Sequence, residues 1–344
     1  MNTPSSPTTE RPILVTGAAG FIGSNVVQQL LDNGHRVVGV DNINDYYTPD
    51  LKQHRVKALS KNSVFTFHPL DIEDRAGLGE LFKTHTFGSV INLAARAGVR
   101  ASIENPFVYY STNQGGTLNL LELMREHGTP KIVLASTSSL YAGQPMPFVE
   151  SMPVNEPISP YAASKKAAEV LAYTYHHLFD IDVSIVRYFT VYGPAGRPDM
   201  SPYRFFNWIA REQPIQLFGD GQQRRDFTFV DCVARGTIAA MRPTGYEIFN
   251  IGNGSPHSIL EMIQMMEELV GKKAIIEFLP THATDMPATW ADASKAKSML
   301  DWEANIDLKE GLQKTWQWHQ EYFAHSPDGR PSLQSAKQPG SAQI

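Results

Sequence analysis

Short apolar runs rich in β-branched residues alternate with longer amphipathic segments from Ile13 to Val186. Runs that are apolar throughout are typical of strands buried on both faces of a parallel sheet, and the segments between them have the periodicity of helices. The pattern therefore predicts an α/β fold, a doubly wound (Rossmann) parallel sheet covered by helices on both faces. Strands are expected at 13–15, 37–40, 64–67, 90–93, 132–134 and 183–186, and helices near 21–33, 73–84, 107–126 and 160–179.

The alternation becomes less regular after Arg187, where a loop rich in Gly and Pro follows. We therefore expect a smaller, discontinuous C-terminal substrate-binding domain beside the sheet domain. The sheet domain is expected to occupy 11–188 and to regain 226–253, because runs at 227–230 and 248–251 are expected to return to the main sheet. The substrate-binding domain is then left with 189–225 and 254–323. Residues 1–10 and 324–344 have the composition of disordered tails.

Composition excludes several functional classes for this chain. The formal net charge is −5 and basic residues form no run, so a nucleic-acid partner is not expected. A signal peptide and an apolar stretch of membrane-spanning length are both lacking, so a membrane partner is not expected either. The single cysteine, Cys232, fits a reducing compartment, and the expected location is cytoplasmic. The histidines show no ligand spacing, and no metal is expected.

A glycine-rich turn with glycines at 17, 20 and 23 lies between the first strand and the first helix. Gly17 and Gly20 allow a tight turn and a close approach of a pyrophosphate, and Gly23 lets the helix pack against the strand. The N-terminus of the helix, at Phe21 and Ile22, then faces the phosphates. In this context the turn predicts a dinucleotide cofactor rather than a simple glycine-rich loop.

Asp41 ends the second strand, 18 residues beyond Gly23. A carboxylate at this position accepts hydrogen bonds from the adenosine ribose and repels a 2′-phosphate, although an Asp in an ordinary turn would look the same. The chain continues with Asn42 and without an arginine, which favours NAD over NADP. Asp71 and Ile72 follow the third strand and are expected near the adenine, with the alternative that Asp71 only caps a helix.

Tyr161 and Lys165 lie in a segment that begins with an N-capping Ser159 and with Pro160 at the first helical position. Residues four apart lie one turn apart on the same helix face. A phenol is a poor base at its usual pKa of about 10, and a neighbouring cation favours the phenolate. Y-x-x-x-K is common, and by itself it describes a surface Tyr and a solvated Lys equally well. Together with the glycine turn it indicates redox chemistry on a hydroxyl group.

Hydroxyl side chains follow the fifth strand at Thr137, Ser138 and Ser139. Ligands gather at the carboxyl ends of the strands in such a sheet. A run of hydroxyls after a strand can also be only a turn. Its pairing with Tyr161 and Lys165 favours a site.

Four segments of the chain, 16–23, 92–95, 136–141 and 161–165, resemble the extended short-chain dehydrogenase/reductase family. Within that family the segments 41–47, 97–100, 187–194 and 196–200 are similar to the UDP-glucuronate 4-epimerases. The similarity extends over about 11–323. It implies NAD as the cofactor, UDP-glucuronate or UDP-galacturonate as the substrate, and a homodimer formed by the helices near 107–126 and 160–179.

The resemblance also implies roles for individual positions. Tyr161 matches the catalytic base, Lys165 its activator, and Thr137 the hydroxyl that binds the reacting oxygen of the sugar. Arg197 would face the sugar carboxylate, or else be a solvated loop arginine. Further cofactor contacts are implied at Ala94, Ala95 and Asn113, and further substrate contacts at Arg100, Ser138, Ser139, Thr190, Arg225 and Asp285. The chain departs from the family pattern at Arg96, Ala142, His282 and Thr284.

The reaction that the resemblance implies is epimerisation at carbon 4 of a UDP-sugar through a 4-keto intermediate, with the hydride held transiently on tightly bound NAD. Three alternatives remain open: a UDP-glucose/UDP-galactose 4-epimerase, a UDP-glucuronate decarboxylase and a non-catalytic NAD-binding sensor. Ser138 and Ser139 replace the acidic residue of related decarboxylases, which favours the epimerase. A neutral sugar would leave Arg197 without a carboxylate partner, and a sensor would not need Tyr161, Lys165 and Thr137 together.

Overall fold

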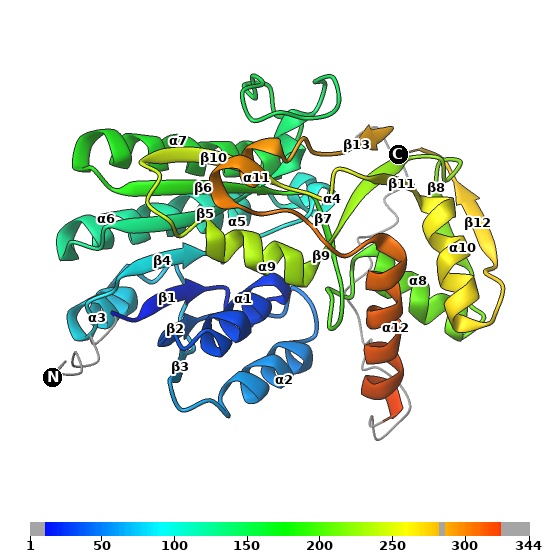
Figure 1. Ribbon diagram of the computed structural model, residues 1–344, viewed down its shortest axis with the longest axis horizontal. Coiled ribbons are helices and arrows are strands. Elements are labelled where there is room, and N and C mark those ends of the chain that lie inside the picture. Colours follow the sequence, from blue (N-terminus) through cyan, green and yellow to red (C-terminus); the bar gives the residue numbers. More distant parts are fainter. Residues whose placement is uncertain (1–10, 282–285, 325–344) are drawn as a thin grey trace, which may run out of the picture.

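The main body of the protein is a parallel sheet of seven strands in the order β10-β6-β5-β4-β1-β2-β3. The fold is known from a computed structural model, which describes residues 11–281 and 286–324. The doubly wound sheet predicted from the sequence is therefore confirmed (Figure 1). Its strands are β1 (Ile13–Thr16), β2 (Val37–Val40), β3 (Phe65–His68), β4 (Ser89–Asn92), β5 (Lys131–Thr137), β6 (Asp182–Tyr188) and β10 (Tyr246–Ile251).

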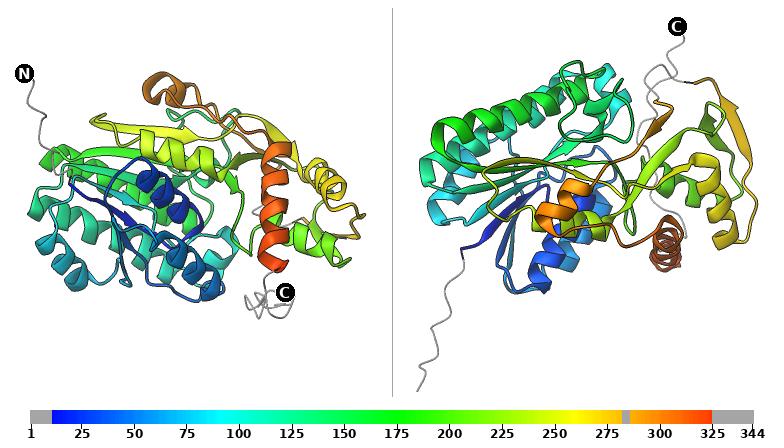
Figure 2. Two further views of the ribbon diagram at one scale, coloured as in Figure 1. Left: turned by 60° about the horizontal axis from the view of Figure 1, so that its bottom comes forward. Right: turned by 45° about the horizontal axis from the view of Figure 1, so that its top comes forward.

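Helices cover both faces of this sheet, as Figures 1 and 2 show. One face carries α1 (Phe21–Asp32), α2 (Pro49–Leu59) and α9 (Val230–Ala239), and the other carries α3 (Arg75–Thr84), α6 (Thr117–His127) and α7 (Pro160–Phe179). The inner strands β1, β2, β4 and β5 are buried along their whole length, whereas the edge strands β3 and β10 are only partly buried. None of the helices in the described ranges is long and apolar enough to cross a membrane.

A smaller region lies at the carboxyl ends of the strands (Figure 1). It contains a sheet of four short strands, β7 (Thr190–Tyr192), β9 (Arg224–Phe229), β11 (Pro256–Ser258) and β13 (Ala288–Thr289), and a pair formed by β8 (Ile215–Phe218) and β12 (Ile276–Leu279). Its helices are α8 (Ser201–Ala210), α10 (Ile259–Val270) and α12 (Leu308–Ala324). A further short helix, α11 (Ser294–Leu300), returns to pack against β10.

One expectation about this region is wrong. The run at 227–230 does not return to the main sheet, because β9 pairs with β7, β11 and β13. Helix α9 and strand β10 do return, as expected for 248–251. Both sheets bury apolar strands, so local composition does not distinguish which sheet a strand joins.

Three helical features were not expected from the pattern. Helix α2 was missed because its buried face combines Leu51 and Leu59 with the basic side chains of Lys52 and Arg55. Helix α4 (Val99–Glu104) has only six residues. The helix expected near 107–126 is divided into α5 (Phe107–Tyr109), a π-helical stretch η1 (Tyr110–Gly116) and α6. Such π-helical stretches often occur at functional sites.

Strand β1 lies between β2 and β4. The chain runs from β1 toward β2 and β3 on one side, and from β4 toward β5 and β6 on the other side, so the strand order reverses between β1 and β4. Ligands of doubly wound sheets bind at this switch point, outside the carboxyl ends of the strands. The polar ends of β1 and β4 are held together here by Thr16, whose hydroxyl donates to Asn92 Oδ1 over 2.7 Å. The loop that follows β1 is therefore the expected place for a ligand in this fold.

Candidate active site

The turn after β1 has the geometry of a diphosphate cradle. Gly17 has a φ of +69°, and a Cβ there would lie 2.7 Å from the Ala94 nitrogen. A Cβ on Gly23 would lie 2.0 Å from the Gly17 carbonyl oxygen. Only glycine fits these positions, because the turn is packed against the end of β4 and the start of α1. The N-terminus of α1 therefore opens onto a space that suits an anionic dinucleotide.

Asp41 is buried at the end of β2 and is fixed by two main-chain amides. Its Oδ2 accepts a hydrogen bond from the Ala19 nitrogen over 3.2 Å, and its Oδ1 accepts one from the Ile43 nitrogen over 2.8 Å. Asn42 donates to Asp71 Oδ2 over 2.6 Å, which joins the two loops predicted to hold the adenosine. Carboxylates in this position suit ribose hydroxyls, so the residues present fit NAD.

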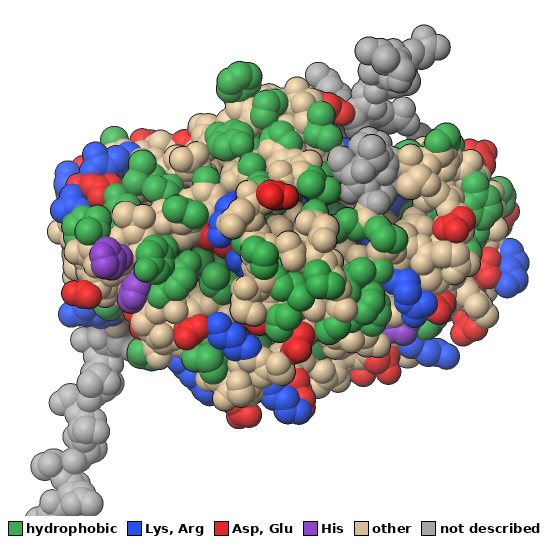
Figure 3. Space-filling view, turned by 90° about the horizontal axis from the view of Figure 1, so that it is seen from above, with side chains coloured by type: hydrophobic (Ala, Val, Ile, Leu, Met, Phe, Trp, Pro, Cys, Tyr) green, Lys and Arg blue, Asp and Glu red, His purple; other side chains and the backbone are tan. Residues whose placement is uncertain are grey.

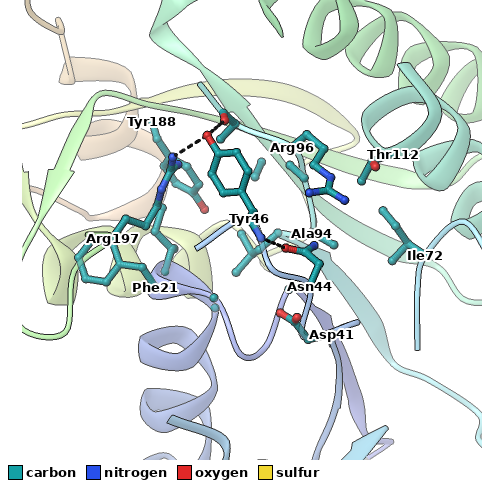
Figure 4. A pocket seen from close by; sticks show the side chains of 18 of the residues that line it. Phe21, Asp41, Asn44, Tyr46, Ile72, Ala94, Arg96, Thr112, Tyr188 and Arg197 are labelled. Atoms are coloured by element: carbon teal, nitrogen blue, oxygen red, sulfur yellow. Dashed lines mark hydrogen bonds between the residues drawn. The ribbon is translucent and has the colours of Figure 1, made fainter. Parts of the chain in front are cut away.

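One cavity is lined by residues from both the predicted cofactor positions and the predicted catalytic positions. In Figure 4 the ring of Tyr46 stands between Arg197 on one side and Arg96 on the other, with Asp41 below it. The predicted residues that line this cavity are Gly17, Gly20, Phe21, Ile22, Gly23, Asp41, Asn42, Asp71, Ile72, Ala94, Ala95, Thr137, Tyr161, Lys165 and Arg197. The structure thus brings together residues from loops that are far apart in the sequence.

Tyr161 and Lys165 lie on the first two turns of α7. This helix begins as expected, with the Ser159 hydroxyl accepting a hydrogen bond from the Ala162 nitrogen over 3.2 Å and with Pro160 in the first position. Burial raises the pKa of Tyr161, while a hydrogen bond with Thr137 and the positive charge of Arg197 oppose that rise. Burial also lowers the pKa of Lys165 to about 8. The side chains of Thr137, Tyr161 and Lys165 line the same cavity as the cofactor cradle, and all three carry groups that are able to transfer a proton.

Behind Lys165, a buried polar network fixes α7 against the sheet. Glu169, one turn after Lys165, accepts hydrogen bonds from Ser136 Oγ over 2.6 Å and from two nitrogens of Arg187 over 2.9 and 2.8 Å. Arg187 also donates to the Tyr141 hydroxyl over 2.8 Å. Because Ser136 directly precedes Thr137, this network fixes the position of the Thr137 hydroxyl relative to α7.

Arg197 extends into the cavity from the loop before α8, as predicted. Its Nε and Nη2 donate to the two carboxylate oxygens of Asp199 over 3.1 and 2.5 Å. The guanidinium lies 5.4 Å from the centre of the Tyr46 ring, and Tyr46 in turn donates its hydroxyl to the Ala97 oxygen over 2.6 Å. Arg197 is therefore a positioned cation close to Tyr161.

Several predicted residues do not line the cavity. Asn113 lies behind its wall, where its side chain accepts from the Arg96 nitrogen over 2.8 Å and donates to Ser164 Oγ over 2.9 Å. Arg100 on α4 stacks over the ring of Phe218. Ser138 and Ser139 lie in the 3₁₀ turn η2 (Ser138–Tyr141), Thr190 lies in β7 and Arg225 lies in β9, and none of the four lines the cavity. Asp285 lies outside the described residues. Ligand contacts of all these residues stay predictions.

Sequence reasoning missed several polar side chains at this site, four of them basic or aromatic groups with a clear place in it. Tyr46, Lys52 and Arg96 line the cavity, and Arg55 lies just behind the glycine turn. Burial lowers the pKa of Lys52, which donates to Asn44 over 2.9 Å. Tyr46 belongs to a segment that carries the family resemblance, and Arg96 lies between two such segments, so a signal existed nearby for both. The buried basic face of α2 left none.

A parallel sheet with a glycine turn after β1, an acidic residue after β2 and a Thr-Tyr-Lys set defines a short-chain dehydrogenase/reductase. The model of the GDP-mannose 4,6-dehydratase family matches residues 14–315, and the chain belongs to this family. The name of a family does not state the reaction of each member.

Curated relatives and solved structures show which members the chain is similar to. It is 57% identical over 309 residues to a UDP-glucuronate 4-epimerase of Thermodesulfobacterium geofontis, which covers 90% of this chain and 96% of that protein. It also resembles the crystal structure of the Bacillus cereus UDP-glucuronic acid 4-epimerase in complex with UDP-glucuronic acid and NAD. That match has a TM-score of 0.85 and 38% identity, and covers 90% of this chain and 99% of the other. A UDP-glucose 4-epimerase of Thermotoga maritima, solved with UDP-glucose, gives a TM-score of 0.82 and 32% identity, with 90% and 99% covered.

Proposed function

We propose that the protein is an NAD-dependent isomerase that interconverts UDP-glucuronate and UDP-galacturonate at carbon 4 of the sugar. The observation that carries the proposal is the placement of Tyr161, Thr137 and Arg197 around one end of the cofactor cavity. Tyr161 can accept the proton of a sugar hydroxyl, Thr137 can hydrogen-bond the same oxygen, and Arg197 supplies a cation suited to a carboxylate. The similarity to two UDP-glucuronate 4-epimerases supports this choice of substrate.

In the proposed mechanism, the Tyr161 oxygen takes the proton of the 4-hydroxyl and later returns a proton to the 4-keto group. A hydrogen bond with Thr137 and the charge of Arg197 lower the pKa of Tyr161 and so favour its phenolate form. Lys165 lies one turn further along α7 and lines the same cavity. NAD, held in the glycine cradle, supplies the hydride acceptor and donor at carbon 4. Since the hydride is returned, the protein requires no external oxidant. The sugar must present both faces to the cofactor, so the UDP group has to serve as its anchor.

The 4-keto sugar is at risk of losing carbon dioxide, because its ketone is β to the carboxylate. Loss of carbon dioxide would leave an enolate that must be protonated at carbon 5, so a site without a carboxyl group beside that carbon disfavours the reaction. The carboxylates among the cavity-lining residues are Asp41 and Asp71, and both are at the adenosine end. At the sugar end the Thr137 hydroxyl donates to Ser139 Oγ over 3.1 Å, and Asp199 is engaged by Arg197. This arrangement favours the epimerase over the decarboxylase.

Incubation of the purified protein with UDP-glucuronate, followed by chromatography of the nucleotide sugars, tests the proposal. The expected product is UDP-galacturonate, and the denatured protein should release NAD rather than NADP. A UDP-pentose product would identify a decarboxylase, and turnover of UDP-glucose alone would identify a neutral-hexose epimerase. Absence of turnover with any UDP-sugar would leave the NAD-binding sensor.

The proposal includes a homodimer. Helices α5, α6 and α7 expose large apolar side chains, among them Phe107 at 83%, Leu178 at 61%, Val170 at 53% and Leu118 at 39%. Figure 3 looks down on the side of the molecule that carries α7 and shows hydrophobic side chains gathered there. Exposed apolar surface of this kind marks an interface, and a second copy of the chain would cover it.

Light scattering coupled to gel filtration tests the dimer. Val170→Asp would place a charge on the exposed face of α7 and should convert the dimer into a monomer. Phe278→Asp, at a residue of β12 that is 59% exposed, is the matched control and should leave the mass unchanged. A monomeric wild-type protein would remove the dimer from the proposal. The location in the cytoplasm also stays a proposal, supported by the single, buried Cys232.

A further inference from the structure

Arg55 is a buried cation, only 5% exposed, that forms no ion pair among the described residues. Its Nη1 donates to the Ala19 oxygen over 2.9 Å and to the Tyr47 hydroxyl over 2.7 Å, and its Nη2 donates to the Ala195 oxygen over 2.5 Å. Its Nε has no hydrogen-bond partner within the described part of the chain. Burial of a charge without a counter-charge is costly, so this arrangement is not explained by stability.

The two main-chain oxygens belong to the two loops that meet at the cavity. Ala19 lies in the glycine turn, and its peptide groups are held on both sides, since its nitrogen donates to Asp41 and its oxygen accepts from Arg55. Ala195 lies two residues before Arg197 and has a φ of +52°, a left-handed conformation that is uncommon for alanine. Arg55 therefore joins the cofactor turn directly to the loop that carries Arg197.

We propose that Arg55 is a positioning residue that couples the cofactor cradle to the loop that carries Arg197. It does not line the cavity, so it acts through Ala19 and Ala195 rather than by touching a ligand. Its charge lies behind the turn that receives the diphosphate, where a cation favours that anion. The part of the proposal that concerns Arg197 rests on the proposed function, whereas the part that concerns the cofactor turn does not.

The chemistry of the side chain explains why an arginine is required. A guanidinium presents separate donors in a fixed plane, so it can bind one loop with Nη1 and the other with Nη2. A lysine has a single ammonium group, which can carry the charge but can reach only one of the two loops. Removal of Arg55 should therefore affect two ligands at once, although Arg55 contacts neither of them.

The test measures two quantities by titration calorimetry in cofactor-stripped protein. The first is the Kd for NAD, and the second is the ratio of the Kd values for UDP-glucose and UDP-glucuronate with NAD present. In Arg55→Met we expect the Kd for NAD to rise by about tenfold or more, as befits lost hydrogen bonds from a charged donor. We expect the sugar ratio to fall by about threefold or more, because the loop of Arg197 loses one such bond.

Arg235→Met is the matched control. Arg235 also joins two segments by a hydrogen bond to a main-chain oxygen, that of Glu303 over 3.4 Å, but it does not line the cavity or contact either loop. Both quantities should keep their wild-type values in this variant. A wild-type Kd for NAD in Arg55→Met would overturn the proposal, and so would a loss of NAD affinity with an unchanged sugar ratio.

Arg55→Lys keeps the proposal testable if Arg55→Met does not fold. Circular dichroism establishes which variants are folded. The lysine keeps the charge and bonds one loop, so at least one of the two quantities should still change by about threefold. Wild-type values for both would overturn the proposal, and unfolding of both variants would assign Arg55 to stability alone and also overturn it. If the wild-type protein does not favour UDP-glucuronate, the proposed function fails on its own, and the NAD titration still tests the cofactor part.

Discussion

Nε and Nη2 of Arg197 bind both carboxylate oxygens of Asp199, so Nη1 is the nitrogen of this guanidinium that makes no hydrogen bond within the described residues. A two-bond ion pair fixes the plane of the guanidinium and its direction. Burial and the neighbouring carboxylate act on the group together, and the carboxylate prevails, raising the pKa of Arg197 above its usual value. Arg197 is therefore a permanent cation with one donor directed away from its protein partner.

Arg197→Ala should remove most of the preference for a sugar that carries a carboxylate. A hydrogen bond to a charged group contributes about 1.5–3 kcal/mol, so the affinity for UDP-glucuronate should fall by roughly ten- to a hundredfold. The affinity for UDP-glucose should change little, because that sugar has no carboxylate. Calorimetric titration of both nucleotide sugars into wild type and variant measures the difference. Equal losses for the two sugars would mean that Arg197 serves the diphosphate or the loop instead.

The same variant should also release some UDP-pentose during turnover. A carboxylate that is no longer held can rotate out of the plane in which its loss is disfavoured. Chromatography of the products detects this directly. A variant that loses affinity without any pentose would limit Arg197 to binding.

Tyr161→Phe should abolish most of the activity and keep the fold. The ring remains and only the ionisable oxygen is removed, and loss of a general base costs about 10²–10⁴-fold in rate. The rate of UDP-glucuronate turnover and the amount of bound NAD are measured together. Tyr109, whose ring meets that of Tyr161 edge-on, provides the matched control, because Tyr109→Phe removes a hydroxyl that bonds the Ala97 oxygen and Tyr46, and Tyr109 does not line the cavity. Near-normal turnover in Tyr161→Phe would refute the assignment of the base.

The pH dependence should follow Lys165. Its pKa is lowered to about 8 by burial, with Glu169 opposing the shift, so the ammonium is lost as the pH rises above 8. A neutral amine no longer favours the phenolate of Tyr161, and kcat/KM should fall on the alkaline side. Lys165→Arg keeps a permanent charge, so this variant should be slower but should lack the fall near pH 8. An unchanged alkaline limb in Lys165→Arg would assign that limb to another group.

Stability should change in the opposite direction over the same range. The folded pKa of Lys165 lies below its usual value of 10.5, so between about pH 8 and 10.5 the unfolded chain binds more protons than the folded chain. The contribution of Lys165 to the free energy of unfolding therefore rises with pH in this window. Thermal melts across the window separate a loss of activity from unfolding.

The parts of the site that the sequence predicts are those with strong local signals. Helix α7 begins where Ser159 and Pro160 require it, and this alone places Tyr161 and Lys165 on one face. The glycine turn is equally local, because the glycines mark a conformation and a close approach that other residues cannot adopt.

The parts that were missed depend on contacts between distant segments. Arg55 lies on a helix whose buried face is half basic, and apolar periodicity cannot find such a helix. Strand β9 was assigned to the wrong sheet, because the residues of a strand do not by themselves determine which strand it pairs with. The hydrogen bond between Arg197 and Tyr46, which are 151 positions apart in the sequence, was missed for the same reason.

The closest packing in the cofactor turn gives a last prediction. A Cβ at position 23 would lie 2.0 Å from the Gly17 carbonyl oxygen and 2.8 Å from the Gly17 carbonyl carbon, and both are main-chain atoms that cannot rotate away. Gly23→Ala should therefore push α1 away from the turn and weaken folding by about 1–3 kcal/mol, with loss of bound NAD. Gly79→Ala in α3 is the control, because its Cβ would meet only Leu123 Cδ2 at 3.7 Å. That change in a partly buried helical position should leave stability equal or raise it, since alanine is favoured over glycine in helices by about 0.8–1.0 kcal/mol. Urea unfolding and chromatography of released NAD measure both variants, and a Gly23→Ala protein with wild-type stability and full NAD content would show that the turn can yield.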